Sequence, residues 1–155
     1  MVERWLGLVV SGGKIAAVEA EVPSEGPLVV QADLTWGLQK GDRPSAYCVM
    51  HRHIADYISE NRIARVVVKA SAISKSATLA HLEAAELRGV VLSAAASVAK
   101  TVALAKANVS RTFGERKADE YIADASFWGA EVTGANLRGG SREAAFMLLA
   151  ARKSQ

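Results

Sequence analysis

The first segment that could have a chemical role is Gly12-Gly13-Lys14, at the end of an apolar run, because such a segment could bind phosphate. A loop that holds phosphates through backbone N–H groups also needs a Gly five places before the Gly-Lys pair and a hydroxyl after it. Leu8 and Ile15 stand at those two positions, so the sequence excludes a phosphate loop of this kind. A Gly pair between two β-type runs predicts a tight hairpin instead, in which both glycines have positive φ as in a type I′ turn.

Histidines and carboxylates at short spacing could hold a metal, and two sets have such spacing. His51 and His53 are two residues apart, so on a helix they point in different directions and cannot share a metal. The side chains of His81, Glu83 and Glu86 would likewise not all point to one place on a helix. We expect both sets to lie on helix surfaces.

The chain that must position these groups has 155 residues and 50% hydrophobic content, enough for one domain over residues 1–155 with a real core. No apolar run reaches the roughly 18 residues of a membrane span, and the start MVERWLG is not typical of a secretory signal. The single Cys48 excludes an internal disulfide and a cysteine metal site, and we expect it in the core. These features predict a cytoplasmic protein that binds no membrane.

Hydrophobic patterning predicts three successive strands and then alternating helices and strands. The predicted strands are 6–11, 15–22, 28–36, 63–71 and 100–105; the predicted helices begin near Pro44 and cover 78–97, 106–112, 116–128 and 141–155, with a loop over 129–140. Continuous valines from Val66 to Val68 indicate a central strand that is covered on both faces. This order predicts an α/β fold with a mixed five-stranded sheet, three antiparallel strands followed by parallel ones, and helices on both faces.

Several side chains have an expected place in these elements. Glu19 and Glu21 lie two apart on one strand and are expected to be solvated hairpin charges. The three tryptophans are expected to anchor the core or an interface rather than stack on bases: Trp5, Trp36 and Trp128. The first helix carries an apolar stripe made of Tyr47, Met50, His51, Ile54, Tyr57 and Ile58.

The order of elements resembles that of the ribonuclease H-like fold, and the residues resemble one branch of it, the RuvC family of Holliday-junction resolvases. The resemblance covers most of the chain in the right order. The sequence also resembles a family of small proteins that have a degenerate version of this fold. The resemblance to the RuvC family rests on the segments WLGLVV, ARVVVKAS, AELRGVVLSAAAS, VAKTVALAKANVSRTFGERKADE and REAAFMLLAA.

Nucleases of this family hold two metal ions with carboxylates, and the resemblance implies where these should stand. It implies an Asp in the first strand, a Glu at the end of the fourth strand and two acids one turn apart in the last helix. Val9 and Lys69 occupy the first two places, and the last pair is Ser141 with Ala144 or Gly140 with Glu143, depending on register. An apolar side chain cannot ligate a hard cation and an ammonium repels one, so we expect no catalytic residue, metal site or cofactor.

The fold that the resemblance implies brings basic residues to the functional edge of the sheet. The predicted nucleic-acid-binding residues are Lys69, Lys75, Arg111, Arg116 and Lys117, with Lys106 beside them. Net charge +3 and a pI near 9.2 are compatible with such a partner without requiring one. These residues could equally be solubilising charges, because Glu115, Asp119 and Glu120 lie close in sequence.

Three hypotheses follow from the sequence. The first is a non-catalytic RuvC-like domain that binds branched or duplex nucleic acid. The second is an active magnesium-dependent nuclease with a rearranged acid set, Glu143, Asp33 and Glu19. The third is a structural interaction protein that forms a homodimer through the Ala-rich helix 78–97, because resolvase relatives are dimeric.

Overall fold

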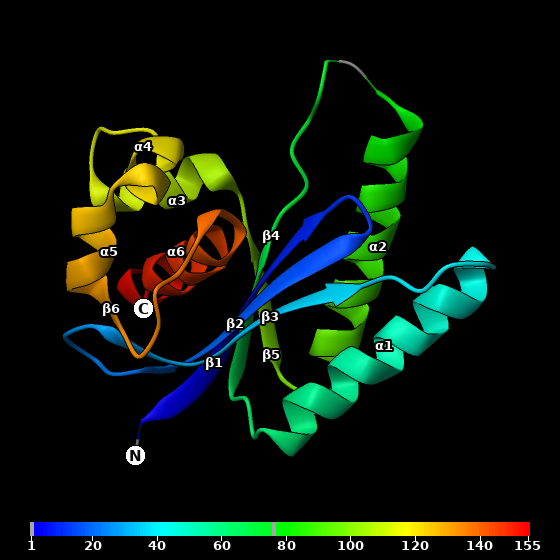
Figure 1. The fold of residues 1–155 in the computed structure, drawn as a ribbon, viewed down its shortest axis with the longest axis horizontal. Helices are drawn as coiled ribbons and strands as arrows, with labels where there is room; N and C mark the ends of the chain where they lie inside the picture. The colour runs from blue at the N-terminus through cyan, green and yellow to red at the C-terminus, as the bar shows by residue number, and fades with distance from the viewer. Residues whose placement is uncertain (1, 76) are drawn as a thin grey trace.

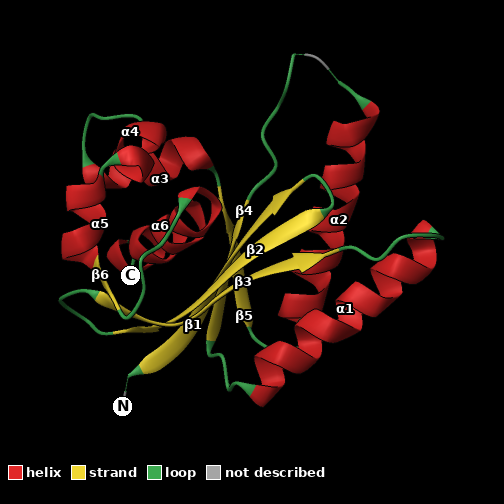
Figure 2. Cartoon of the chain, viewed as in Figure 1, coloured by secondary structure: helices red, strands yellow, loops and turns green. Residues whose placement is uncertain are grey.

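The computed structural model describes residues 2–75 and 77–155. Its strands form one sheet in the order β5-β4-β1-β2-β3-β6 (Figure 2). The strands are β1 (Glu3–Ser11), β2 (Lys14–Val22), β3 (Leu28–Gly37), β4 (Arg65–Lys69), β5 (Lys100–Leu104) and β6 (Val132–Thr133). The first three are antiparallel, while β4, β5 and β6 each pair in parallel with a neighbour, so the predicted mixed α/β sheet is confirmed.

The sheet has six strands rather than the predicted five. The additional strand, β6, lies in the segment 129–140 that the sequence predicts to be a loop. It has two residues, which pair with Leu28 and Val29 of β3. A strand this short has no alternating pattern, so hydrophobic periodicity could not have predicted it.

The hairpin between β1 and β2 forms at the predicted glycines. Ser11 pairs with Lys14, which leaves Gly12 and Gly13 as the two turn residues. Only Gly12 of the two has a positive φ, 61°. The hairpin is confirmed and the type I′ assignment is wrong, because positive φ at the first central residue alone is the pattern of a type II′ turn.

Helices cover both faces of the sheet, as predicted (Figure 1). One face carries α1 (Arg43–Glu60) and α2 (Leu79–Ala96), and the other carries α6 (Gly139–Lys153) with α3 (Lys106–Phe113), α4 (Ala118–Ala123) and α5 (Ala125–Glu131). The two longest helices, α1 and α2, begin at side-chain caps, since Asp42 accepts a bond from the Ser45 N–H and Thr78 from the His81 N–H.

The predicted helix 116–128 is two helices, α4 and α5. Asp124 ends the first of them and caps the second. Its carboxylate accepts hydrogen bonds from the backbone N–H groups of Ser126 and Phe127, at 3.0 and 3.2 Å. A carboxylate that bonds to the N–H groups two and three residues ahead starts a new helix, so the chain turns here.

Alternating side chains divide the core into two layers. Leu6 and Leu8 of β1 point toward α1 and α2, while Trp5 and Val9 point toward α6. In β4, Val67 faces α6 and its neighbours face α2, which confirms that this central strand is covered on both faces. No helix in the described part of the chain is long and apolar enough to cross a membrane.

Gly7 allows α6 to lie directly against β1. A Cβ on this glycine would be 2.4 Å from the backbone oxygen of Ala144, far closer than a real contact. A residue without a side chain is therefore needed where the helix crosses the strand. This contact sets the depth of α6 and brings its first turn toward the carboxyl ends of β1 and β4.

Two expectations about single side chains are wrong. Cys48 is exposed on α1 rather than in the core, because Ala46, Met50 and Ile54 form the buried face of this helix. Glu19 is buried, with 3% of its surface exposed, rather than solvated. Trp5 and Trp128 are buried as predicted.

Candidate nucleic-acid interface

The site begins where the end of β4 meets the first turn of α6. Lys69, the last residue of β4, donates a hydrogen bond from Nζ to Oε1 of Glu143 at 2.8 Å. Both side chains are mostly covered, with 21% and 15% exposed. Val9 lies on the same face of the sheet as α6 and is buried. The positions at which the RuvC resemblance implies metal-binding acids therefore lie together in the structure. They are occupied by a valine, a lysine and one carboxylate.

A second lysine extends this contact into a chain of charges. Lys106, at the first turn of α3, lies 2.6 Å from Oδ1 of Asp119 and 3.7 Å from Oε2 of Glu143. We call Lys69, Glu143, Lys106 and Asp119 the ion-pair chain. Two ammonium groups and two carboxylates alternate in it, so its formal charges cancel.

The contact between Lys106 and Asp119 shifts the pKa of both groups in favour of their charged forms. The hydrogen bond to Asp119 is the largest influence on Lys106, and with the nearby Glu143 carboxylate it raises the pKa of that amine. The same hydrogen bond lowers the pKa of the Asp119 carboxyl. Each of these two charges stabilises the ionised form of the other.

The acids proposed for a rearranged nuclease do not come together. Asp33 accepts a hydrogen bond from the hydroxyl of Ser141, so it lies beside the start of α6. Glu19 instead accepts one from the hydroxyl of Tyr57 at 2.6 Å, and Tyr57 lies on α1, which covers the opposite face. Within residues 2–75 and 77–155, no group of three or more histidines, cysteines or acids could hold a metal ion.

The predicted binding residues fall into two groups. Lys69 is held in the ion-pair chain, and Arg116 lies 3.1 Å from a carboxylate oxygen of Asp124. Lys75, Arg111 and Lys117 are exposed, and none of them forms an ion pair with a described residue. The exposed group is the one whose charge is available to a ligand.

The exposed cations belong to segments at one edge of the sheet. Lys75 lies in the loop after β4, Arg111 in α3 and Lys117 at the start of α4. Figure 1 shows this loop and these helices on either side of the strand ends near the β1–β2 hairpin. A ligand that touches both sides would pass over the ion-pair chain.

Arg88 of α2 anchors the loop after β4 and was not recognised from the sequence. Its guanidinium donates to the hydroxyl of Ser71 at 2.6 Å and to the backbone oxygen of Val10 at 3.3 Å. Burial lowers the pKa of this guanidinium. The available signal was an arginine beside Leu87 in an otherwise apolar segment, at a helix position that faces the sheet.

The histidine sets lie on helices, as expected. His53 is exposed on α1, with its ring edge against Trp36 at 4.8 Å between centroids. His51 of the same helix is half-buried, with Nε2 3.4 Å from the hydroxyl of Ser93. Glu83 forms an ion pair with Arg43 and so links α2 to α1. These contacts join α1 to β3 and to α2.

Comparison with known proteins shows the fold. No protein-family model and no curated protein sequence matches the chain. Among solved structures, Thermus thermophilus RuvC is similar over 97% of this chain and 95% of its own, with a TM-score of 0.74 at 14% identity. T. thermophilus RuvC in complex with a Holliday junction substrate covers 98% and 94%, with a TM-score of 0.71 at 13% identity.

A third similar structure comes from a different organism. The yeast mitochondrial Holliday junction resolvase Ydc2 is similar over 98% of this chain and 80% of its own, with a TM-score of 0.68 at 8% identity. The chain therefore has the RuvC-like fold that the resemblance implied.

Proposed function

We propose that this RuvC-like domain binds branched or duplex nucleic acid and does not cut it by two-metal chemistry. The observation that carries the proposal is the pairing of Glu143 with Lys69 and Lys106 at the end of β4. A two-metal nuclease needs several carboxylates around its cations at this place. Here one of two carboxylates is bonded to both lysines, so a divalent cation would have to displace two ammonium groups.

The binding surface in this proposal consists of Lys75, Arg111 and Lys117. Exposed cations on two sides of the sheet edge can neutralise phosphates without reading base sequence. The T. thermophilus RuvC structure with a Holliday junction substrate supports a junction as the first ligand to test. Lys69 and Lys106 would contribute less, because their charges are balanced by Glu143 and Asp119.

A native gel with labelled four-way junction, duplex and single-stranded DNA tests the proposal, at low and moderate salt and with magnesium present. We expect a shift of intact junction or duplex that weakens steeply with salt. No shift at low salt would contradict the binding proposal. Cleavage that Glu143→Ala abolishes would contradict the non-catalytic part and favour a nuclease.

Charge reversal locates the surface. The double variant Arg111→Glu/Lys117→Glu should weaken binding by about tenfold or more and make the salt dependence shallower, because phosphate contacts are lost. The control is Lys100→Glu, which changes the net charge half as much at an exposed lysine at the start of β5, at the opposite end of the strands. A loss in Lys100→Glu at least half as large on a logarithmic scale would show that binding depends on net charge rather than on this surface.

A further inference from the structure

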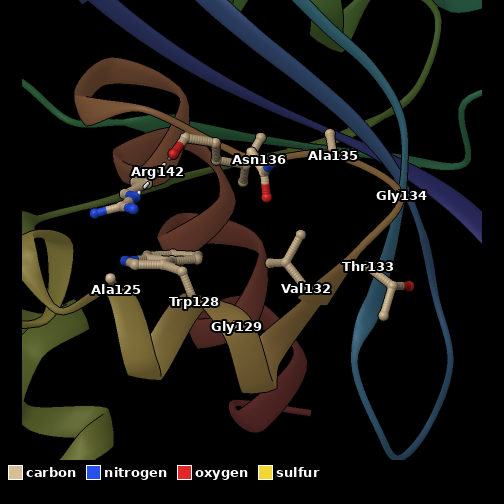
Figure 3. A pocket seen from close by; sticks show the side chains of 10 residues that line it. Ala125, Trp128, Gly129, Val132, Thr133, Gly134, Ala135, Asn136 and Arg142 are labelled. Carbon is tan, nitrogen blue, oxygen red and sulfur yellow. Dashed lines mark hydrogen bonds between the residues drawn. The ribbon is translucent and has the colours of Figure 1, made fainter.

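A hollow lies beside the first turn of α6, and none of the residues of the ion-pair chain lines it. It has a volume of about 580 Å³ and lies between α5, β6 and the segment that leads into α6. Trp128, Val132, Asn136 and Arg142 line it, with Gly129 at its wall (Figure 3). Sites for small molecules commonly have volumes of roughly 300–1,000 Å³.

Arg142 brings an unbalanced positive charge to this hollow. Its Nε donates to the backbone oxygen of Leu137 and its Nη1 to that of Ile122, each at 2.9 Å. Two carbonyl groups thus hold the guanidinium in place without neutralising it. No acid in the described part of the chain forms an ion pair with it. Nη2 has no partner among the described residues, so a rigid donor is free to bind an anion.

Trp128 provides a fixed flat wall. Its Nε1 donates to the backbone oxygen of Tyr121 at 3.0 Å, and the side chain is buried. Edge contacts with Phe127 and Phe146, at 5.2 and 6.1 Å between ring centroids, hold the plane of the indole. Figure 3 shows Asn136 reaching into the same hollow, above Val132. A ligand would meet an aromatic ring, an apolar side chain, an amide and a cation.

We infer that this hollow binds a small, planar organic anion. The guanidinium selects a carboxylate or phosphate group, since it donates in a fixed planar geometry that matches both. Trp128 and Val132 have only 5% and 7% of their surfaces exposed, so they offer the ligand a narrow apolar wall, which favours a flat body over a bulky one. Glu143 is the next residue after Arg142 but contacts Lys69 and Lys106, so this site is separate from the proposed nucleic-acid surface and does not depend on it.

Isothermal titration calorimetry with matched probes tests the site on the full chain. Indole-3-acetate represents carboxylates and adenosine 5′-monophosphate represents phosphates, with indole-3-acetamide and adenosine as neutral analogues. We expect at least one anion to bind with a 1:1 stoichiometry and about tenfold or more tighter than its neutral analogue. Absence of binding by both anions up to about 1 mM, or equal binding of anion and analogue, would overturn the inference.

Filling the hollow provides the decisive variant. A Cβ on Gly129 meets nothing within 4 Å, so Gly129→Leu should extend into the hollow without a backbone clash. Gly89→Leu is the matched control, because Gly89 is also a helical glycine with open space, on α2 at the other face of the sheet. Anion binding should be lost in Gly129→Leu and kept in Gly89→Leu. Retained binding in Gly129→Leu would show that the anion binds elsewhere, and an unchanged DNA gel shift would show that the two sites are independent.

Discussion

Each face of the sheet holds a glutamate that is paired with a cation. The two glutamates differ in whether solvent and ligands can reach them. Glu19 has 3% of its surface exposed under α1, with Tyr57 at 2.6 Å and Arg4 at 3.2 Å. Glu143 lies at the strand ends with 15% exposed, beside Lys69 and Lys106. Glu19 has partners that a ligand cannot displace, whereas Glu143 sits where solutes approach. We therefore assign Glu19 to stability and Glu143 to the electrostatics of the proposed binding edge.

The largest effect should come from the contact that positions Glu143. Gly7→Ala places a Cβ 2.4 Å from the Ala144 oxygen, so α6 must move away from β1. We expect a loss of about 3 kcal/mol in the free energy of unfolding, measured by urea denaturation. Gly13→Ala is the control, since a Cβ there meets nothing within 4 Å. Equal, small losses in both proteins would mean that α6 adjusts freely.

Removing the charge of Glu19 should have the next largest effect. Glu19→Gln keeps the size of the side chain but weakens its bonds to Tyr57 and Arg4 in a buried place. A loss of about 2 kcal/mol in the free energy of unfolding follows from the usual contribution of hydrogen bonds to charged groups. Glu21→Gln, two residues along the same strand and half-buried, should change stability by less than about 0.5 kcal/mol. Similar losses of stability in the two variants would show that the buried Glu19 contributes no more to stability than the half-buried Glu21.

The contact between Glu19 and Tyr57 also predicts a dependence on alkaline pH. Burial and the hydrogen bond to Glu19 raise the pKa of the Tyr57 hydroxyl above its ordinary value of 10.0. Above pH 10 the unfolded chain loses this proton while the folded chain keeps it, so stability should fall as pH rises through that range.

Unfolding at a series of pH values measures this contribution. Tyr57→Phe should remove part of the fall in stability above pH 10. Tyr47→Phe is the control on the same helix, where the hydroxyl bonds to Glu86 and Arg43 at the surface. Parallel pH curves for Tyr57→Phe and the unaltered protein would contradict the assignment.

The two glutamates also show which features of the structure the sequence could predict and which it could not. Val66 to Val68 reveal a strand covered on both faces, because every position in the run is apolar. No local sequence pattern reveals the hydrogen-bond partner of Glu19, because Tyr57 lies 38 residues away on a helix that crosses the sheet. An alternating charged pair on a strand then looks like solvated surface.

The convergence at Glu143 came from resemblance rather than from local pattern. Lys69 and Glu143 are 74 residues apart, and only a known arrangement of strands and helices places them together. The same knowledge did not foresee that Lys106 would complete the ion-pair chain or that Arg88 would anchor the loop after β4. Both depend on side-chain direction, which the order of elements leaves open.

The smallest effect should come from opening the ion-pair chain itself. Lys69→Met retains the length of the apolar stem but removes the ammonium group, while Lys106 still lies 3.7 Å from Glu143. We expect a loss of less than about 1 kcal/mol in the free energy of unfolding, because partly exposed ion pairs contribute little and are screened by salt. Urea denaturation at low and high salt measures it, with Lys100→Met as the control for loss of a lysine that forms no ion pair with a described residue. A salt-independent loss as large as that of Glu19→Gln would show that Glu143, like Glu19, is a buried structural charge, and the contrast between the two faces would then be wrong.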